Sequence, residues 1–347
     1  MIDLRSDTAT RPTDGMRAAI AAAAVGDEQR REDPSVNALQ ERAATLLGQE
    51  TALFVPTATM ANQIALKLHS RPGDVLVAER HAHVVIYEYG GAAAHAGLMV
   101  ETIEGRRGRF GVEDLEAVTE PSTKSADQRP AVLALEDTHN SSGGRCWPLD
   151  ELRAVTAAAR DRGLRTHLDG ARLLNAAVAT GVAAAELGAP FDTVTLCLSK
   201  GLGCPLGAVL AGSRETFDRA WREKHLFGGA MRQAGIVAAA GVYALDHHVD
   251  RLADDHARAR RLAEGWEAAG LPVDLDQVET NFVQVDVGAL GLDQADALAR
   301  LRDAGVGLSS TIHPTIVRAV THLDVDDDAI DRAIELVPRA LGTRVAA

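Results

Sequence analysis

The sequence of 347 residues predicts an α/β protein with a mainly parallel central sheet and a smaller C-terminal α+β domain. Short apolar runs alternate with helical patterns over residues 14–245, as strands do when crossover helices join them. A long helical pattern over residues 250–270 then changes this rhythm. Because a chain of this length usually exceeds one small core, we expect two domains. They are an N-terminal arm with a large α/β domain, residues 1–245, and the smaller domain, residues 246–347.

Seven apolar runs in the first domain have the length of buried strands. These runs are ALFV (52–55), DVLVAE (74–79), GLMVETI (97–103), AVLALE (131–136), RTHLD (165–169), DTVTLC (192–197) and GAVLAG (207–212). Helical patterns, such as those over residues 59–69 and 149–163, lie between most of them. Strands that alternate with helices in this way predict a parallel sheet with helices on both faces.

The second domain shows a different order of elements. After the long helical pattern, the sequence predicts a strand and then a helix, at residues 281–286 and 293–304. Two short strands near residues 307–310 and 315–321 follow, and a final helix lies near residues 326–341. Such a mixture, without regular alternation, is typical of an α+β domain.

Composition limits the classes of function. The net charge of −13 argues against nucleic acid or an anionic membrane surface as a partner. Cys146, Cys197 and Cys204 are odd in number and widely spaced, which indicates reduced thiols and neither a disulfide framework nor a metal site. The N-terminus lacks the apolar core of a signal peptide, and no window is long enough to span a bilayer. We therefore expect a cytoplasmic protein with a small-molecule substrate.

Two unusual side chains follow neighbouring strand runs. Asp169 ends RTHLD, and Lys200 follows TVTLCL directly before a glycine-rich turn. In open α/β sheets, ligands bind outside the carboxyl ends of the strands. Alone, Asp169 could cap the next helix and Lys200 could extend to solvent. Together they offer an amine for a Schiff base and a carboxylate for a pyridinium nitrogen, which is the pair that pyridoxal phosphate needs.

Other residues could bind a phosphate or act as a base. VPTATMAN (55–62) offers a helix N-terminus after a strand, with Thr57 and Thr59 as hydroxyl donors; ordinary N-capping is the alternative. His83 follows the run at 74–79, and its imidazole could stack on a flat ring and accept a proton. A lone histidine is often structural, and His81 competes for the same role.

Two arginines and the N-terminal arm complete the candidates. Arg232 follows two glycines in GGAMRQ, and Arg318 lies within the apolar run TIVRAVTHLD. A guanidinium in such a run pairs with a carboxylate or phosphate, either of a ligand or of a structural ion pair. Arg5, Ser6 and Asp7 crowd together near the N-terminus, where a solvated arm is the alternative.

The order of these motifs resembles the low-specificity L-threonine aldolase family over residues 2–340. The motifs are DLRSDTAT, DPSVNALQ, EDTHN, HLDGARL, LSKGLG, GGAMRQAGI and VRAVTHLD. The family belongs to the β-eliminating-lyase group of pyridoxal-phosphate enzymes of fold type I, whose fold is aspartate-aminotransferase-like. The resemblance implies a lyase of amino acid metabolism. It would cleave L-threonine, L-allo-threonine and related β-hydroxy-α-amino acids to glycine and an aldehyde.

Two alternatives to this activity stay open. The same cofactor chemistry could serve β-elimination, hydroxymethyl transfer or a specialised aldol synthesis. A second alternative, from another class, is a non-catalytic relative that binds the cofactor structurally.

The resemblance also implies roles for individual residues. It implies the Schiff base at Lys200, the pyridinium partner at Asp169, and His83 stacked on the ring, where His83 is also our candidate base for the β-hydroxyl. It implies phosphate binding by Thr57, Ala58, Thr59 and, from the neighbouring subunit, Arg232. It implies binding of the substrate carboxylate by Ser6, Arg172 and Arg318, with Arg172 next to the cofactor as well. The implied assembly is a homotetramer of dimers, with active sites at the dimer interface.

Two departures from the family pattern affect these expectations. Family members commonly read Thr-Gly-Thr where this chain has Ala58 between the two threonines, but alanine keeps its N–H, so phosphate binding should persist. Arg30 and Arg31 replace the usual Tyr-Gly in the loop that precedes the Asp-Pro pair. These guanidiniums could alter which amino acid is accepted, or they could face solvent.

Overall fold

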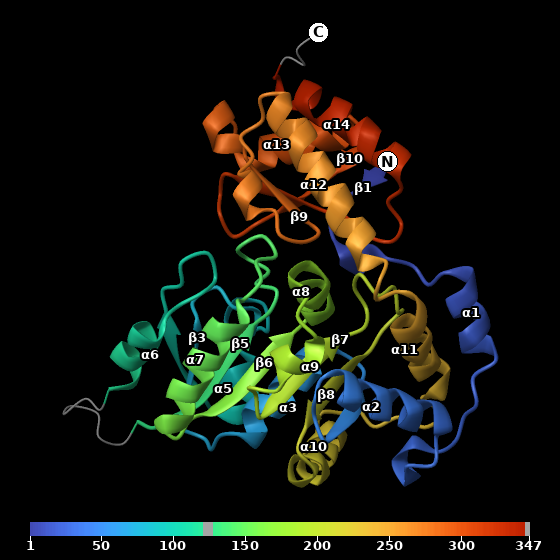
Figure 1. Cartoon of the computed structure of the whole chain (residues 1–347), viewed down its shortest axis with the longest axis vertical. Helices are drawn as coiled ribbons and strands as arrows, with labels where there is room; N and C mark the ends of the chain where they lie inside the picture. Colours follow the sequence, from blue (N-terminus) through green and yellow to red (C-terminus); the bar gives the residue numbers. More distant parts are fainter. Residues whose placement is uncertain (121–127, 344–347) are drawn as a thin grey trace.

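A seven-stranded sheet organises the first part of the computed structural model, which describes residues 1–120 and 128–343 (Figure 1). Five neighbouring strands of this sheet pair in parallel, which confirms the predicted mainly parallel sheet. In spatial order the strands are β2 (Thr51–Val55), β8 (Ala208–Gly212), β7 (Thr193–Cys197), β6 (Arg165–Gly170), β5 (Pro130–Glu136), β3 (Val75–Glu79) and β4 (Met99–Ile103).

Strand β8 runs opposite to the other six strands. It pairs antiparallel with β7 on one side and with β2 on the other. The connection between β7 and β8, residues 198–207, contains no helix. It is also shorter than the roughly twelve residues that a parallel crossover needs. The chain therefore turns back after β7, and Lys200 lies in that turn.

Alternate residues of the strands face two helical layers. Val77, Leu133 and Leu168 point into one apolar cluster, whereas Leu76 and Val132 point into a cluster on the opposite face. The first layer contains α1 (Asp14–Ala21), α2 (Pro34–Leu46), α6 (Val112–Thr119), α7 (Leu149–Asp161), α8 (Leu173–Thr180), α9 (Ala184–Gly188) and α11 (Gly235–His247). The second contains α3 (Ala58–Leu68), α4 (His83–Ile86), α5 (Gly91–Ala96) and α10 (Arg214–Leu226).

The second part of the chain forms its own core, which Figure 1 shows in orange and red at the top of the view. Its three-stranded sheet is antiparallel. Its elements are α12 (Leu252–Ala268), β9 (Phe282–Asp286), α13 (Gln294–Asp303), β10 (Val306–Gly307), β11 (Ser309–Ser310), β12 (Ile316–Val320) and α14 (Asp327–Leu341). None of the described helices combines the length with the apolar character that a membrane span requires.

The N-terminal strand departs from the predicted division at residues 245 and 246. Strand β1 (Ile2–Asp3) pairs in parallel with β10, and the side chains of Ile2 and Leu4 lie in the second core. The arm therefore joins the smaller unit with its first residues before the chain enters the larger one. This arrangement also brings Ser6 and Asp7 to the region between the two cores.

Two histidines share one hydroxyl group inside the large sheet. The Oγ1 atom of Thr193 lies 2.9 Å from His167 Nδ1 and 2.9 Å from His69 Nε2. Burial lowers the pKa of His167 to about 4 and that of His69 to about 3. Both imidazoles are therefore neutral in the folded protein at neutral pH.

We predict that the folded state loses stability as the pH falls from 7 to 5, and that His167 causes part of this loss. An unfolded histidine, with a pKa of about 6.5, takes up a proton in this range, whereas buried His167 does not, so protons favour unfolding. At pH 5 the difference corresponds to about 2 kcal/mol. In a His167→Gln variant, which cannot titrate, the free energy of unfolding in urea should fall by about 2 kcal/mol less than in the parent. An equal loss in both proteins would contradict the assignment.

Candidate active site

A cavity of about 380 Å³ lies between the carboxyl ends of the central strands and the smaller unit. This volume falls within the range of about 300–1,000 Å³ that is usual for small-molecule sites. The cavity brings together five residues that the sequence proposed as site residues from distant segments. They are Ser6, His83, Arg172, Lys200 and Arg318.

Lys200 is held at the cavity by its backbone. Its carbonyl oxygen accepts hydrogen bonds from Thr10 Oγ1 and from the Gly203 N–H, both at 2.8 Å. Gly203 has a φ of +76°, a conformation that glycine adopts without strain. The fixed turn directs the Lys200 side chain to the cavity wall, where its amine has no hydrogen-bond partner among the described residues.

Asp169 lies on the strand next to the one that leads to Lys200, as the spacing predicts. Strands β6 and β7 pair in parallel, with Asp169 opposite Thr195. The Asp169 carboxylate is buried and accepts hydrogen bonds from Asn62 Nδ2 at 2.8 Å and from the Ala171 N–H at 3.1 Å. The helix-capping alternative is wrong, because α8 begins after Arg172 and has no side-chain cap. A carboxylate has about four acceptor positions, so Asp169 can still accept a pyridinium N–H.

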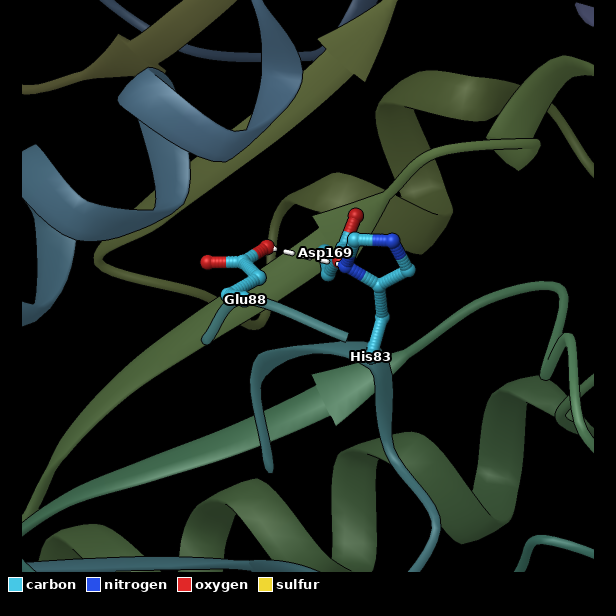
Figure 2. Close-up of side chains that lie close together, drawn as sticks. All are labelled: His83, Glu88 and Asp169. Atoms are coloured by element: carbon cyan, nitrogen blue, oxygen red, sulfur yellow. Dashed lines mark hydrogen bonds and ion pairs between the residues drawn. The ribbon is translucent and has the colours of Figure 1, made fainter. Parts of the chain in front are cut away.

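His83 faces this carboxylate. Figure 2 shows His83, Glu88 and Asp169 pointing toward one another, and one ligand atom from each lies within 4.8 Å of the others. His83 Nδ1 lies 2.9 Å from Glu88 Oε1. Burial disfavours the protonated imidazole, but the Glu88 and Asp169 carboxylates outweigh this effect and raise the pKa of His83. The backbone N–H of His83 donates to Glu136 Oε2 at 2.7 Å, which fixes the start of α4.

The structure separates His83 from its competitor His81. The His81 ring lies 5.9 Å, between centroids, from the ring of His313, and its backbone N–H donates to Glu79. His83 lines the cavity, whereas His81 is not among the lining residues that the structure describes. His83 is therefore the histidine that can meet a ligand in this cavity.

Arg172 is fixed by a carboxylate of the N-terminal arm. Its Nε and Nη2 atoms donate to the two carboxylate oxygens of Asp7, both at 2.7 Å, and both side chains are buried. Burial alone would raise the pKa of Asp7, but the Arg172 guanidinium holds it far below its usual range. Such a bidentate pair orients the guanidinium and leaves Nη1 directed toward Asn140 Oδ1, at 3.4 Å.

Arg318 meets neutral groups in the structure. It donates to Asn140 Oδ1 at 3.0 Å and to Ser309 Oγ at 3.3 Å. No carboxylate among residues 1–120 and 128–343 pairs with it, so the structural ion pair that the sequence left open is absent from this part of the chain. Burial and the nearby Arg172 lower the pKa of Arg318 to about 10, so it stays charged at neutral pH. Arg318 can therefore bind a ligand carboxylate.

The turn at residues 57–59 caps a helix and also exposes two hydroxyl groups at the start of that helix, as the sequence suggested. Thr57 caps α3, with its Oγ1 accepting the Met60 N–H at 3.1 Å. The side chains of Thr57 and Thr59 are exposed, and the Thr57 hydroxyl keeps its own proton for donation. Helix α3 also carries Asn62, which contacts Asp169, so the turn and the buried carboxylate are connected through one helix.

Three of the proposed arginines lie away from the cavity of their own chain. Arg232 is 64% exposed, and its Nη1 lies 3.2 Å from Asp27 Oδ2. Arg30 extends toward the same carboxylate at 3.9 Å and is also exposed. The Arg31 guanidinium stacks on aromatic rings of α10, 5.1 Å from the centroids of Phe217 and Trp221, and pairs with Asp218 at 2.8 Å. Within this chain, Arg30 and Arg31 lie at the outer surface and do not reach the cavity.

Sequence reasoning missed several residues that build the site. Asn62, Glu88, Glu136 and Asn140 all contact proposed site residues, and Asp7 was named from the sequence without being given a role. Asn62, Glu136 and Asn140 lie inside the quoted motifs VPTATMAN and EDTHN, whereas Glu88 lies outside every quoted motif. A polar residue at the carboxyl end of an apolar strand run, such as Glu136 after AVLAL, is a signal that the sequence offers for some of them.

The donor set fits pyridoxal phosphate. Lys200 offers an amine, and Asp169 offers a buried carboxylate with acceptor positions left for a ring N–H. The start of α3 offers backbone N–H groups and hydroxyls, which suit a phosphate. Each of the three chemical groups of the cofactor therefore has a complementary group in this chain.

Comparisons with known proteins agree with the expected family. Residues 3–289 match the family described as beta-eliminating lyase. The chain is 40% identical over 331 residues to the low specificity L-threonine aldolase of Escherichia coli strain K12, covering 95% of this chain and 96% of the relative. It is 37% identical over 334 residues to low-specificity L-threonine aldolase 1 of Arabidopsis thaliana, covering 93% of each.

A solved structure extends the agreement to the fold. The chain superposes on the threonine aldolase of Leishmania major with a TM-score of 0.84 and 20% identity, covering 98% of this chain and 99% of the other. This match confirms the expected α/β architecture of fold type I. The chain belongs to the β-eliminating lyase family, within its group of low-specificity L-threonine aldolases.

Proposed function

We propose that this chain uses pyridoxal phosphate to cleave L-threonine, L-allo-threonine and related β-hydroxy-α-amino acids to glycine and an aldehyde. The observation that carries the proposal is that Asp169 and Lys200 lie at the same end of two neighbouring strands, and that Lys200 lines one cavity together with two guanidiniums. An amine and a carboxylate suit the cofactor, and guanidiniums suit the carboxylate of an amino acid. The family relationship supports a lyase with this cofactor.

Different residues around the cavity can take the separate roles that retro-aldol cleavage requires. When bound, pyridoxal phosphate supplies an aldehyde for the Lys200 amine and a ring that withdraws electrons from the substrate Cα. Arg318 and Arg172, whose guanidiniums both contact Asn140 Oδ1, would bind the α-carboxylate of the substrate, near Ser6. Asp169 would hold the proton on the ring nitrogen.

His83 is our candidate for the base that removes the β-hydroxyl proton. Its Nδ1 contacts Glu88, so its Nε2 remains for the substrate hydroxyl, directly or through a water. The buried Glu88 carboxylate stabilises the imidazolium that forms when His83 takes up this proton. Cleavage of the Cα–Cβ bond then leaves the β-carbon as an aldehyde.

The products discriminate this activity from its alternatives. The purified protein with added pyridoxal phosphate should release acetaldehyde from L-threonine and L-allo-threonine, and benzaldehyde from phenylserine, each with one glycine. Release of pyruvate and ammonia would instead indicate β-elimination. A cofactor spectrum that does not respond to glycine or threonine, together with no product, would indicate a non-catalytic relative.

Arg318→Ala should raise KM for every amino-acid substrate, because each has the same α-carboxylate. Loss of one charge-assisted hydrogen bond corresponds to roughly tenfold or more in binding. Arg318→Lys, which keeps the charge, should recover part of the loss. Steady-state kinetics with threonine and phenylserine would check this, and an effect on phenylserine alone would assign Arg318 to the side-chain pocket instead.

We further propose a cytoplasmic homo-oligomer, a tetramer of two dimers, in which neighbouring subunits share each site. Arg232 is exposed, and two residues near it in the sequence, Leu226 (62%) and Ile236 (48%), expose apolar side chains. Exposed apolar side chains in a segment that also exposes a cation suit an interface with a second copy. The turn at residues 57–59 has no cationic side chain of its own, so a partner's arginine would complete a phosphate site. The three buried free cysteines suit a reducing compartment.

Complementation between an inactive and a strongly impaired variant should reveal a shared site. Lys200→Ala and Arg232→Ala chains would be unfolded together, refolded and assayed. If Arg232 serves its neighbour, one site of each hybrid dimer carries both substitutions and the other carries neither, so activity returns. If Arg232 serves its own subunit, every site keeps one substitution, and hybrids that form without activity would contradict the proposal.

A further inference from the structure

A path of hydrogen bonds runs through the large sheet beneath Asp169. Asn62 Nδ2 lies 2.8 Å from Asp169 Oδ2, and Asn62 Oδ1 lies 3.1 Å from His167 Nε2. His167 Nδ1 lies 2.9 Å from Thr193 Oγ1, which lies 2.9 Å from His69 Nε2. His69 is half-buried and lines a polar cavity of about 750 Å³. The path therefore connects a second cavity with the carboxylate beneath the proposed cofactor site.

Two carboxylates fix the orientation of the Asn62 amide. An ionised carboxylate accepts hydrogen bonds and cannot donate them. Asn62 Nδ2 contacts both Asp169 Oδ2, at 2.8 Å, and Glu88 Oε1, at 2.9 Å, so both of its protons point at carboxylates. Asn62 Oδ1 therefore faces His167 and accepts a hydrogen bond from its Nε2–H.

The same reasoning fixes the rest of the path. Because burial keeps His167 neutral, its Nδ1 carries a lone pair and accepts the proton of the Thr193 hydroxyl. Thr193 Oγ1 then accepts the Nε2–H of His69. Every donor consequently points along the path toward Asp169, and each hydrogen bond polarises the next.

Asp169 needs such donors because it is only 2% exposed. A buried carboxylate keeps its charge where N–H groups replace the water that it has lost. Asn62 supplies one of these groups, and the backbone of Ala171 supplies another. The hydrogen bond from His167 strengthens the donation by Asn62.

The Asn62 amide also contacts Glu88, which in turn contacts His83 in the cavity lining. The Glu88 oxygen that accepts from Asn62 lies 2.9 Å from His83 Nδ1. Gln63, the next residue of α3, donates to the other Glu88 oxygen. Asn62 thus contacts both the proposed ring-nitrogen partner and the carboxylate that orients His83, whereas Gln63 contacts only the latter.

We propose that Asn62 and His167 are positioning residues that hold the buried Asp169 carboxylate in the orientation that meets the ring nitrogen of pyridoxal phosphate. Asn62 acts by direct contact, and His167 acts through Asn62. The inference rests on the proposed function, because it requires the cofactor to bind above Asp169. Substitution of His69 should change the affinity for pyridoxal phosphate less than substitution of Asn62 or His167 does, since water from the adjoining cavity can replace the hydrogen bond that His69 makes.

The neighbouring amides of α3 provide a matched test. Cofactor-free Asn62→Leu and Gln63→Leu proteins would be titrated with pyridoxal phosphate, with the visible absorbance of the lysine-bound cofactor as the signal. Asn62→Leu should raise Kd roughly tenfold or more, and Gln63→Leu should change it less than about twofold. The melting temperatures of both cofactor-free variants measure the stability lost at these two buried positions.

A second pair of variants tests His167 separately. His167→Leu should raise Kd several-fold, because Asn62 Oδ1 loses its donor. His167→Gln keeps an N–H for Asn62 and should restore Kd to within about twofold of the parent. If His167 merely filled space, leucine and glutamine at this position would give the same Kd.

The outcomes separate this inference from the proposed function. If the parent gives no visible band with pyridoxal phosphate, the proposed function fails. If the parent binds and both leucine variants of α3 shift Kd equally, or if Kd follows melting temperature at every position, the positioning role is wrong. If Asn62→Leu does not fold, the two His167 variants decide the question.

Discussion

Replacing Lys200 by alanine should reduce turnover of L-threonine to background and remove the visible absorbance of the bound cofactor. Within the described part of the chain, Lys200 carries the one amine that lines the cavity. Without it no Schiff base can form, and an aldehyde cofactor is held only by non-covalent contacts. Borohydride reduction followed by peptide mapping should attach the cofactor to the Lys200 peptide of the parent and to no peptide of the variant.

The fold should survive this substitution. The turn is held by the Lys200 carbonyl, which accepts from Thr10 and Gly203, and alanine keeps this carbonyl. A melting temperature close to that of the parent would show this. Lys67 offers a matched control, because its amine pairs with Glu223 at 2.8 Å and it is not among the residues that line the cavity. Lys67→Ala should therefore keep full turnover. Full activity in Lys200→Ala would overturn the proposed chemistry.

Replacing Asp169 by asparagine should weaken cofactor binding and strongly reduce turnover at saturating cofactor. A neutral amide cannot hold a proton on the ring nitrogen as a carboxylate does. Loss of a charge-assisted hydrogen bond of ~1.5–3 kcal/mol corresponds to roughly 10–150-fold in affinity. Titration of the cofactor-free variant with pyridoxal phosphate measures this change.

The surroundings of Asp169 sharpen this prediction. Asn62 and the Ala171 N–H both donate to the carboxylate, so an asparagine at 169 would direct its own N–H₂ against one of these donors. Asp169→Glu keeps the charge and should retain more affinity than Asp169→Asn. Equal affinity and rate in the parent and in Asp169→Asn would remove the role assigned to this carboxylate.

Local patterns in the sequence predicted the large sheet and the two central groups of the site. Apolar runs report burial, and their alternation with helices requires parallel neighbours, so the strands of Asp169 and Lys200 come to lie side by side. The helix start at Thr57 is equally local, since a hydroxyl caps the next N–H groups of its own segment. These features depend on residues close together in the chain, and the sequence displays them directly.

Other features depended on packing between distant segments, which no local pattern encodes. Asn62 meets Asp169 because α3 packs across the sheet, and Asp7 meets Arg172 because the N-terminal strand pairs with β10. The motifs named Arg318 as a cation but left its partner open, and the tertiary structure leaves it facing Asn140 near the cavity. The sequence by itself determined the fold class and the chemical groups at the strand ends. The tertiary structure alone decided which buried polar groups satisfy one another, because burial forces each donor to find its acceptor wherever the packed chain places it.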